Sequence, residues 1–210
     1  MIARLTSYKD PLIEKAYEEG MKNLEDFFQF KWVVNKPRVF TVSNRQTFDE
    51  ISGEKTESWV VGRSQGGNIF LLDKENFEKE SNHIYRENYY VALLKHELCH
   101  LFYWTVCRGY TKPRWLNEGI CTFTSGQLEL KKRPDKIDEF LDFYDVITKG
   151  EKMVYDECGF VVEWLINKHG KEKLLELIKR SKDYQSEEKF KELFEEIYKF
   201  KLSYENFLVE

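Results

Sequence analysis

The first half of the chain combines helical periodicity with short strand-like runs. Asp10 and Pro11 predict the start of a helix, because the carboxylate can cap it and proline tolerates the first helical position. Apolar residues then recur at helical spacing up to Phe28. The shorter apolar runs predict a strand at residues 38–42, a helix at 46–51 and a hairpin formed by 59–63 and 68–72.

The second half of the chain is patterned for helices. The run from Tyr89 to Val106 is apolar on nearly all sides, which is typical of a helix buried in the middle of a domain. Gly109 closes this helix, and Pro113 begins another that stops near Gly126. The remaining periodicity predicts helices at about 155–169, around 174–178 and around 190–197. The sequence therefore predicts an α+β fold, with a small mixed sheet and a mostly helical C-terminal half.

Length and composition narrow the class of protein. The chain has 210 residues, of which 41% are hydrophobic and 33% charged, as in an ordinary globular protein. The length predicts one domain or two tightly joined lobes. We treat the chain as a single domain, with a sub-domain of helices and strands at about 1–103 and a helical sub-domain at about 104–210. The net charge is −4 and basic residues alternate with acidic ones, as in Lys171–Glu172–Lys173, so we expect no nucleic-acid partner. The oligomeric state is not readable from the sequence.

Three features bear on the cellular compartment. No apolar run approaches the roughly 18–20 residues that cross a bilayer, so we expect no membrane partner. The first ten residues lack the apolar run of a secretion signal. The cysteines form no Cys-x-x-Cys pair, and without an export signal we interpret them as reduced thiols of a cytoplasmic protein. They are Cys99, Cys107, Cys121 and Cys158.

Candidate chemistry is concentrated in the segment HELCH, residues 96–100, which is an instance of the HExxH motif. On a helix, His96 and His100 lie one turn apart on the same face, so their imidazole nitrogens can meet a single zinc ion. Glu97 projects beside that face, where its carboxylate can take a proton from water that the zinc activates. A helix this apolar would otherwise bury three titratable groups at a high cost in free energy. The sequence therefore predicts a site for one Zn²⁺ per chain.

A catalytic zinc site usually has three protein ligands, so one more is expected. His83 lies in a polar loop and His169 stands next to a helix-ending glycine, and both positions are more typical of surface residues. Glu118, in the segment WLNEG, begins a helix that is otherwise apolar on the same side, and a short loop separates it from HELCH. Its alternative role is to favour the N-terminal end of that helix. We interpret Glu118 as the third ligand.

HELCH followed by WLNEG resembles the gluzincin metallopeptidases, in which the glutamate of an Asn-Glu-Gly type motif on the next helix is a zinc ligand. The closer resemblance is to the small peptidase MA-like domains, or minigluzincins. Their glutamate helix reads much like RWLNEGICTFTSG and is followed by segments similar to YDECGFVVEWL and GKEKLLELI. The weaker N-terminal similarity, RVFTVSNRQTFDEISG and then GGNIFLL, extends the resemblance over most of the chain from about Lys36. It implies a zincin-like fold of the thermolysin type and hydrolysis of a peptide or protein substrate.

The resemblance also implies a substrate-binding strand. The family's sheet ends in an edge strand above the zinc, and its unpaired backbone groups hold an extended peptide. Here that strand would consist of Gly67, Asn68, Ile69, Phe70 and Leu71. The alternative is an ordinary core strand.

A second implied role belongs to Tyr155, which begins a helix where the family has a tyrosine. A phenol at this position can stabilise the tetrahedral intermediate of peptide hydrolysis. The alternative is a structural tyrosine that caps the helix. Three other tyrosines are lower-ranked candidates for the same role, namely Tyr103, Tyr110 and Tyr144.

Two positions depart from familiar patterns. Thr122 stands four residues after Glu118, where some gluzincins have a carboxylate that orients a zinc-bound histidine, so that partner must come from elsewhere. Cys99 lies inside the motif near the ligand face, where its oxidation would poison or regulate the metal. We interpret Cys99 as a small buried residue, with the oxidation-sensitive role as the alternative.

We therefore predict a zinc metallopeptidase in which the metal polarises the scissile carbonyl. Glu97 is expected to act as general base and to pass the proton to the leaving amine. The alternative is a zinc-binding interaction or regulatory domain of the same fold without significant peptidase activity. A latent enzyme, with the N-terminal helix or the C-terminal segment KLSYENFLVE across the cleft, is a further alternative.

Overall fold

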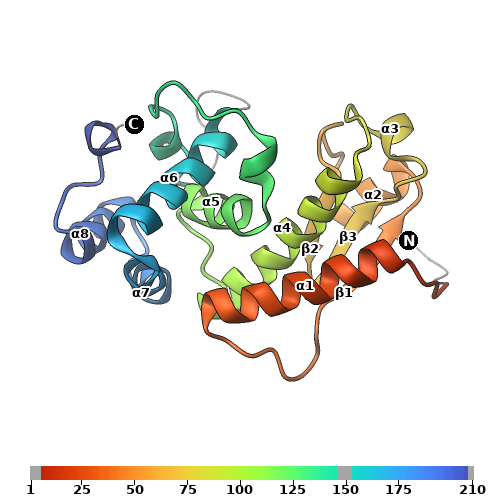
Figure 1. Ribbon diagram of the computed structural model, residues 1–210, viewed down its shortest axis with the longest axis horizontal. Helices are drawn as coiled ribbons and strands as arrows, with labels where there is room; N and C mark the ends of the chain where they lie inside the picture. The colour runs from red at the N-terminus through yellow and green to blue at the C-terminus, as the bar shows by residue number, and fades with distance from the viewer. Residues whose placement is uncertain (1–5, 146–152, 208–210) are drawn as a thin grey trace. The chain divides into compact units, whose positions relative to one another are not determined.

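The computed structural model describes residues 6–145 and 153–207, and the chain divides into two compact units, Met1–Leu101 and Phe102–Glu210 (Figure 1). The described residues form eight α-helices, three short 3-10 helices and one three-stranded sheet, so the predicted α+β class is confirmed. The strands of this sheet belong to the first unit, and the described part of the second unit is helical. None of the helices described is both long enough and apolar enough to cross a membrane.

Helix α1 (Pro11–Phe28) opens the first unit, and its ends form as the sequence predicts. The Asp10 carboxylate accepts hydrogen bonds from the backbone N–H groups of Leu12 (3.1 Å) and Ile13 (3.3 Å). At the other end, Gln29 adopts a left-handed backbone with φ 53° and donates its N–H to a carbonyl in the last turn.

The sheet consists of β1 (Arg38–Val42), β2 (Gly62–Gln65) and β3 (Asn68–Leu72), in the order β1-β3-β2. β1 runs parallel to β3, whereas β2 pairs with β3 in the antiparallel direction. The predicted hairpin is confirmed, although its first strand begins at Gly62 rather than at residue 59. Gly66 and Gly67 form its two-residue turn with φ of 59° and 76°, a backbone conformation that favours glycine.

Two short helices complete the first part of this unit. α2 (Arg45–Ser52) begins where the Asn44 side chain accepts a hydrogen bond from the N–H of Thr47 (2.9 Å), and it ends at Gly53 with φ 76°. This helix confirms the prediction for residues 46–51. α3 (Phe77–Glu80) is a single turn, which is too short for hydrophobic periodicity to predict.

Helix α4 (Glu87–Val106) begins in the first unit, and its last residues belong to the second. The hydroxyl of Tyr90 donates a hydrogen bond to the carbonyl of Leu72 at the end of β3 (3.0 Å). α1 contacts α4 where Gly20 lies against Leu98. The residues that α4 buries confirm the predicted buried helix, and in the first unit they include Tyr90, Ala92, Leu93, Leu94, Leu98 and Cys99.

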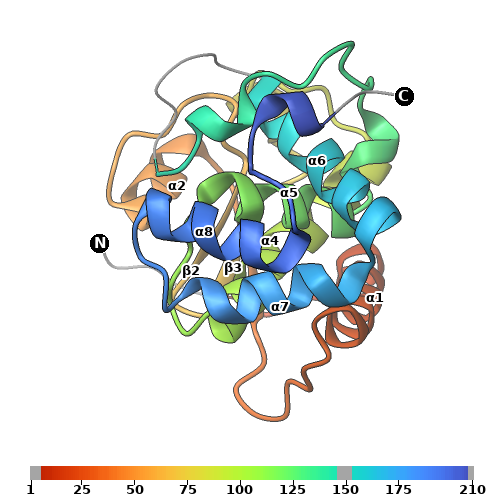
Figure 2. The same cartoon turned by 90° about the vertical axis from the view of Figure 1, so that its left-hand side faces the viewer.

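The second unit is built from α5 (Arg114–Thr124), α6 (Met153–His169), α7 (Lys171–Ser181) and α8 (Glu187–Tyr198). Three 3-10 helices accompany them: η1 (Gln127–Leu130), η2 (Phe140–Asp142) and η3 (Tyr204–Asn206). α7 and α8 pack side by side (Figure 2). The helices predicted after Pro113 and in the last third of the chain are therefore confirmed.

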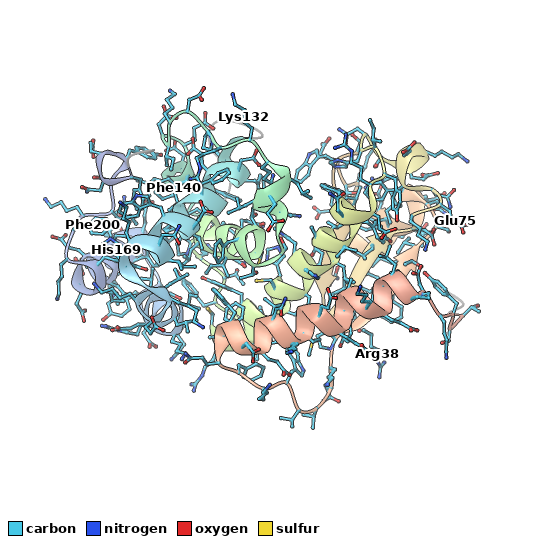
Figure 3. All side chains as sticks on the ribbon, viewed as in Figure 1. Arg38, Glu75, Lys132, Phe140, His169 and Phe200 are labelled. Atoms are coloured by element: carbon cyan, nitrogen blue, oxygen red, sulfur yellow. The ribbon has the colours of Figure 1, made fainter. Side chains whose placement is uncertain are left out.

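Glycines and aromatic side chains determine how closely these helices approach. A Cβ atom on Gly119 of α5 would lie only 2.4 Å from the carbonyl oxygen of Cys158 on α6, so this contact requires glycine. At the end of α6, the ring of His169 stacks on Phe200 with centroids 5.3 Å apart (Figure 3). This contact attaches the segment after α8 to α6.

Candidate metal centre

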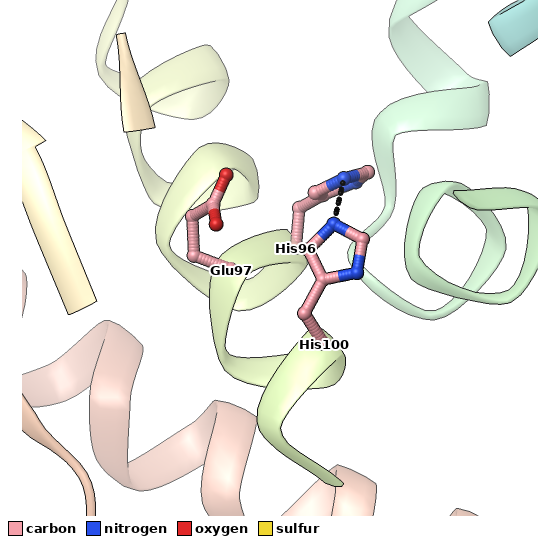
Figure 4. A group of neighbouring side chains, drawn as sticks. All are labelled: His96, Glu97 and His100. Atoms are coloured by element: carbon pink, nitrogen blue, oxygen red, sulfur yellow. Dashed lines mark hydrogen bonds between the residues drawn. The ribbon is translucent and has the colours of Figure 1, made fainter. Parts of the chain in front are cut away.

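Helix α4 places His96 and His100 on one face, as their spacing predicts. Their Nε2 atoms lie 3.1 Å apart, and the two rings meet edge to face with centroids 4.7 Å apart (Figure 4). The backbone alone explains why the rings converge, because residues four apart stand above one another on a helix.

Glu97 completes a group of three potential ligands on α4. One nitrogen from each histidine and one oxygen of Glu97 all lie within 4.8 Å of one another. Glu97 retains 7% of its exposure and His96 9%, so both polar groups are buried. The pKa of the nearby Tyr89 is raised, mainly by burial and to a smaller extent by the negative charge of Glu97. This group is the HExxH cluster of the first unit.

Strand β2 lies directly against Glu97. A Cβ atom on Gly62 would come within 3.0 Å of both Cγ and Oε1 of Glu97, and within 2.9 Å of Cδ1 of Leu93. The carboxylate therefore occupies the space beside the first residue of β2.

The expected substrate-binding strand needs a correction. Asn68, Ile69 and Phe70 belong to β3, which lies between β1 and β2 and pairs with both, while Gly67 belongs to the turn. A strand with a neighbour on each side has its backbone groups engaged in the sheet and offers no edge to a peptide. In the described sheet β2 is the edge strand next to Glu97, and its sequence, GRSQ, gave no hydrophobic signal that could single it out.

Glu118 lies in the second unit, in the middle of α5, and retains 5% of its exposure. The Nη2 atom of Arg114, one turn earlier on the same helix, donates a hydrogen bond to Oε1 of Glu118 (3.1 Å). The same guanidinium lies over the ring of Phe143 at 5.8 Å. Sequence reasoning missed Arg114, although its spacing of four residues from Glu118 was a usable signal.

Tyr155, on α6, is close enough to Glu118 for the two groups to interact electrostatically. Burial, and then the charge of Glu118, raises the pKa of Tyr155 to about 12, with Arg114 acting in the opposite direction. The ring of Tyr155 meets that of Phe143 edge to face with centroids 5.3 Å apart. The second unit thus brings together two of the predicted site residues, Glu118 and Tyr155.

A buried carboxylate holds the segment that carries Phe143. Glu157 accepts backbone hydrogen bonds from Asp138 (3.3 Å), Glu139 (2.7 Å) and Phe140 (2.9 Å). Further along, the carbonyl of Phe143 accepts the N–H of Trp115 (2.9 Å) at the start of α5. Burial raises the pKa of Glu157 despite these hydrogen bonds. No pattern in the sequence pointed to this carboxylate, because its partners are backbone groups far along the chain.

The other residues singled out in the sequence form hydrogen bonds within the protein or are buried in it. Nε2 of His83 lies 2.9 Å from the carbonyl oxygen of Trp59, and the hydroxyls of Tyr110 and Tyr144 lie 3.1 Å apart. Tyr103 is fully buried in the second unit. Cys99 and Thr122 are also buried, which agrees with the interpretation of Cys99 as a small buried residue.

No protein-family model, curated protein or solved structure matches this chain. What the residues themselves define is an α+β protein with an HExxH cluster on a central helix and, in its second unit, a group formed by Arg114, Glu118 and Tyr155.

Proposed function

We propose that this chain is a zinc-dependent metallopeptidase of the gluzincin kind, with a zincin-like fold similar to the peptidase MA-like domains. The observation that supports it most is the approach of the His96 and His100 Nε2 atoms to 3.1 Å on one helix face. Both nitrogens can direct a lone pair at one cation from these positions.

The donor set fits zinc. Two nitrogens at about 2.0–2.1 Å from a tetrahedral zinc ion are separated by about 3.3–3.4 Å. The observed separation of the two Nε2 atoms is 3.1 Å. A small rotation of either imidazole ring would bring it to the value expected around zinc. Two imidazoles and one carboxylate are also a ligand set found at catalytic zinc sites, which keep a fourth position for water.

Glu118 is proposed as the carboxylate ligand. The proposal rests on the similarity of WLNEG to the gluzincin glutamate helix and on the environment of the side chain in the second unit. Arg114 binds Oε1 of Glu118 and restricts the orientation of the carboxylate. Outer partners of this kind fix the orientation of a metal-binding carboxylate.

The proposal assigns roles to the remaining residues. A bound zinc ion would supply Lewis acidity to polarise the scissile carbonyl and acidify water. Glu97 takes a proton from the attacking water and delivers it to the leaving amine. Tyr155 carries its proton at neutral pH, as tyrosine ordinarily does, and donates a hydrogen bond to the developing oxyanion. An extended peptide pairs with the edge of β2, next to Glu97.

A mass-spectrometric cleavage screen tests the catalytic part of this proposal. The zinc-loaded protein and the variant Glu97→Gln, at matched zinc content, are each incubated with a mixed peptide library. Glu87→Gln is the matched control, because Glu87 is an exposed carboxylate in the first turn of the same helix. We expect cuts from the wild type and from Glu87→Gln, and a loss of at least about 100-fold in Glu97→Gln.

Two outcomes would contradict the proposal. Cleavage that persists undiminished in Glu97→Gln would show that another group is the base. No cleavage by a wild type that carries one zinc per chain would favour the zinc-binding interaction domain instead.

The metal ligands are tested separately by competition with a chelator. We expect His96→Ala, His100→Ala and Glu118→Gln each to weaken zinc binding by at least about 100-fold, because each removes one of three protein ligands. His83→Ala is the control and should bind zinc as the wild type does. If Glu118→Gln kept wild-type zinc affinity, the gluzincin assignment would be wrong even if the histidines proved to be ligands.

A further inference from the structure

Gly62 occupies the closest approach between β2 and α4. A Cβ atom there would lie 2.9 Å from Cδ1 of Leu93 and 3.0 Å from both Cγ and Oε1 of Glu97. Non-bonded carbon atoms prefer separations of about 3.5–4.0 Å, so a side chain at this position cannot be accommodated without movement.

The backbone conformation gives no reason for glycine at this position. Gly62 is not among the glycines with positive φ, unlike Gly66 and Gly67 in the following turn. Glycine weakens a strand because it has no side chain to pack, and its presence there often marks a site that another group approaches closely. Here the approaching groups are the side chains of Glu97 and Leu93.

We propose that Gly62 is a positioning residue for Glu97: the missing side chain lets the carboxylate lie against β2, and any larger residue displaces it. The steric part of this inference is independent of the proposed function. Its effect on catalysis rests on the proposed role of Glu97 as general base.

Hydrogen bonds hold β2 in place beside Glu97. Gly62 pairs with Leu71 in the sheet, and the preceding carbonyl, that of Val61, accepts the N–H of Leu72 (2.9 Å). One residue further back, Nη1 of Arg45 donates a hydrogen bond to the carbonyl of Val60 (2.6 Å). A side chain can relieve a steric clash by rotating about its torsions, whereas β2 can move only by breaking these bonds.

Gly20 offers a matched control on the same helix. A Cβ atom on Gly20 would lie 3.1 Å from Cδ2 of Leu98 and 3.3 Å from Cγ of Lys95, so alanine there also crowds α4. The atoms closest to this position belong to neither His96, Glu97 nor His100. A general disturbance of α4 should therefore appear in both glycine variants, and displacement of Glu97 only in Gly62→Ala.

The first arm of the experiment is a double-variant cycle measured as melting temperature in metal-free protein. We expect Gly62→Ala to lower Tm by about 3–6 °C, the range for moderate overpacking in a chain of this size. In a Glu97→Ala background the same substitution should cost at most half as much, because Cγ and Oε1 are gone. Gly20→Ala should cost the same in both backgrounds. Equal costs of Gly62→Ala in the two backgrounds would overturn the proposal.

The second arm measures zinc affinity and peptide hydrolysis. We expect Gly62→Ala to lower kcat by about 10–100-fold through misplacement of the base, with zinc affinity within twofold of the wild type. Gly20→Ala should retain kcat within twofold. A wild-type kcat in Gly62→Ala would overturn the positioning role. If the wild type itself cleaves nothing, the proposed function fails while the melting cycle still decides the inference about Gly62.

A third variant covers the case in which Gly62→Ala does not fold. Recovery of a cooperative melting transition in Gly62→Ala/Glu97→Ala would then support the contact with Glu97. Recovery in Gly62→Ala/Leu93→Ala alone would assign the crowding to Leu93 and overturn the proposal.

Discussion

Replacing Gly119 with alanine probes the contact between α5 and α6 on which Glu118 depends. Gly119 directly follows Glu118, and a Cβ atom there would lie 2.4 Å from the carbonyl oxygen and 2.8 Å from the carbonyl carbon of Cys158. Both atoms belong to the backbone of α6, so no side-chain rotation can relieve the overlap. The two helices would have to separate.

The expected loss of stability is the difference between two effects. Overpacking a well-packed contact costs about 1–3 kcal/mol. Because the atoms that Gly119→Ala would crowd belong to the backbone and cannot rotate away, we expect a cost near the upper end, about 3 kcal/mol. Alanine in place of glycine inside a helix returns about 1 kcal/mol. The net loss is about 2 kcal/mol, which lowers Tm by roughly 4–8 °C in a chain of this length.

Thermal melting followed by circular dichroism measures this loss, and Gly159 on α6 provides the comparison. A Cβ atom on Gly159 would lie 2.7 Å from Cδ2 of Leu128 and from Cγ2 of Thr122, both side-chain atoms. We expect Gly159→Ala to lose less stability than Gly119→Ala and to recover part of it when Thr122→Ser removes Cγ2. If Gly119→Ala had the same Tm as the wild type, the reasoning would be refuted, because a Cβ atom 2.4 Å from a backbone oxygen must destabilise the contact between the helices.

Three further predictions concern charged and polar groups of the second unit. Burial raises the pKa of Glu157 in the folded protein above its ordinary value of 4.5. The protonated Glu157 side chain therefore contributes to stability below pH 4.5, and this contribution is lost as the pH rises through the pKa of the folded protein. The Tm of the wild type minus that of Glu157→Gln should thus fall as the pH is raised from 4.5 to neutrality, and a rising difference would contradict the sign. On the proposed oxyanion role of Tyr155, Tyr155→Phe should lower the kcat of peptide hydrolysis by about 100-fold or more without changing zinc affinity, and an unchanged kcat would exclude that role. On the proposed role of Glu118 as a zinc ligand, Arg114→Gln should weaken zinc binding about 10-fold in chelator competition, since outer partners of metal ligands typically have effects of this size. Unchanged binding would show that the contact with Arg114 does not orient Glu118.

The sequence predicted the elements whose signals are local. Asp10 and Pro11 start α1 as expected, because a cap needs only neighbouring residues. The spacing of His96 and His100 predicted their convergence for the same reason, since one helical turn determines it. The α+β class followed from counting such elements along the chain.

What the sequence could not predict depends on residues that are distant along the chain. Strand order is one case, because the hydrophobic pattern of NIFLL shows a buried strand without showing whether it lies at the centre or the edge of the sheet. The edge strand next to Glu97, GRSQ, begins later than the predicted run at 59–63, because the hydrophobic residues that marked that run precede it. Glu157 is another case, since its partners are backbone N–H groups of residues 138–140, which have no sequence signature.

The contact between Gly62 and Glu97 combines two residues that are each unfavourable for packing. Glycine weakens a strand, and a buried carboxylate loses hydration free energy. A β-branched residue on β2 facing an apolar one on α4 would satisfy both the strand and the core. Such local conflicts with good packing are expected where function rather than stability selects the residues. Since the conflict falls on the one acidic residue of HELCH, it favours a chemical role for Glu97 independently of the motif, and it does so from a strand that the motif does not include.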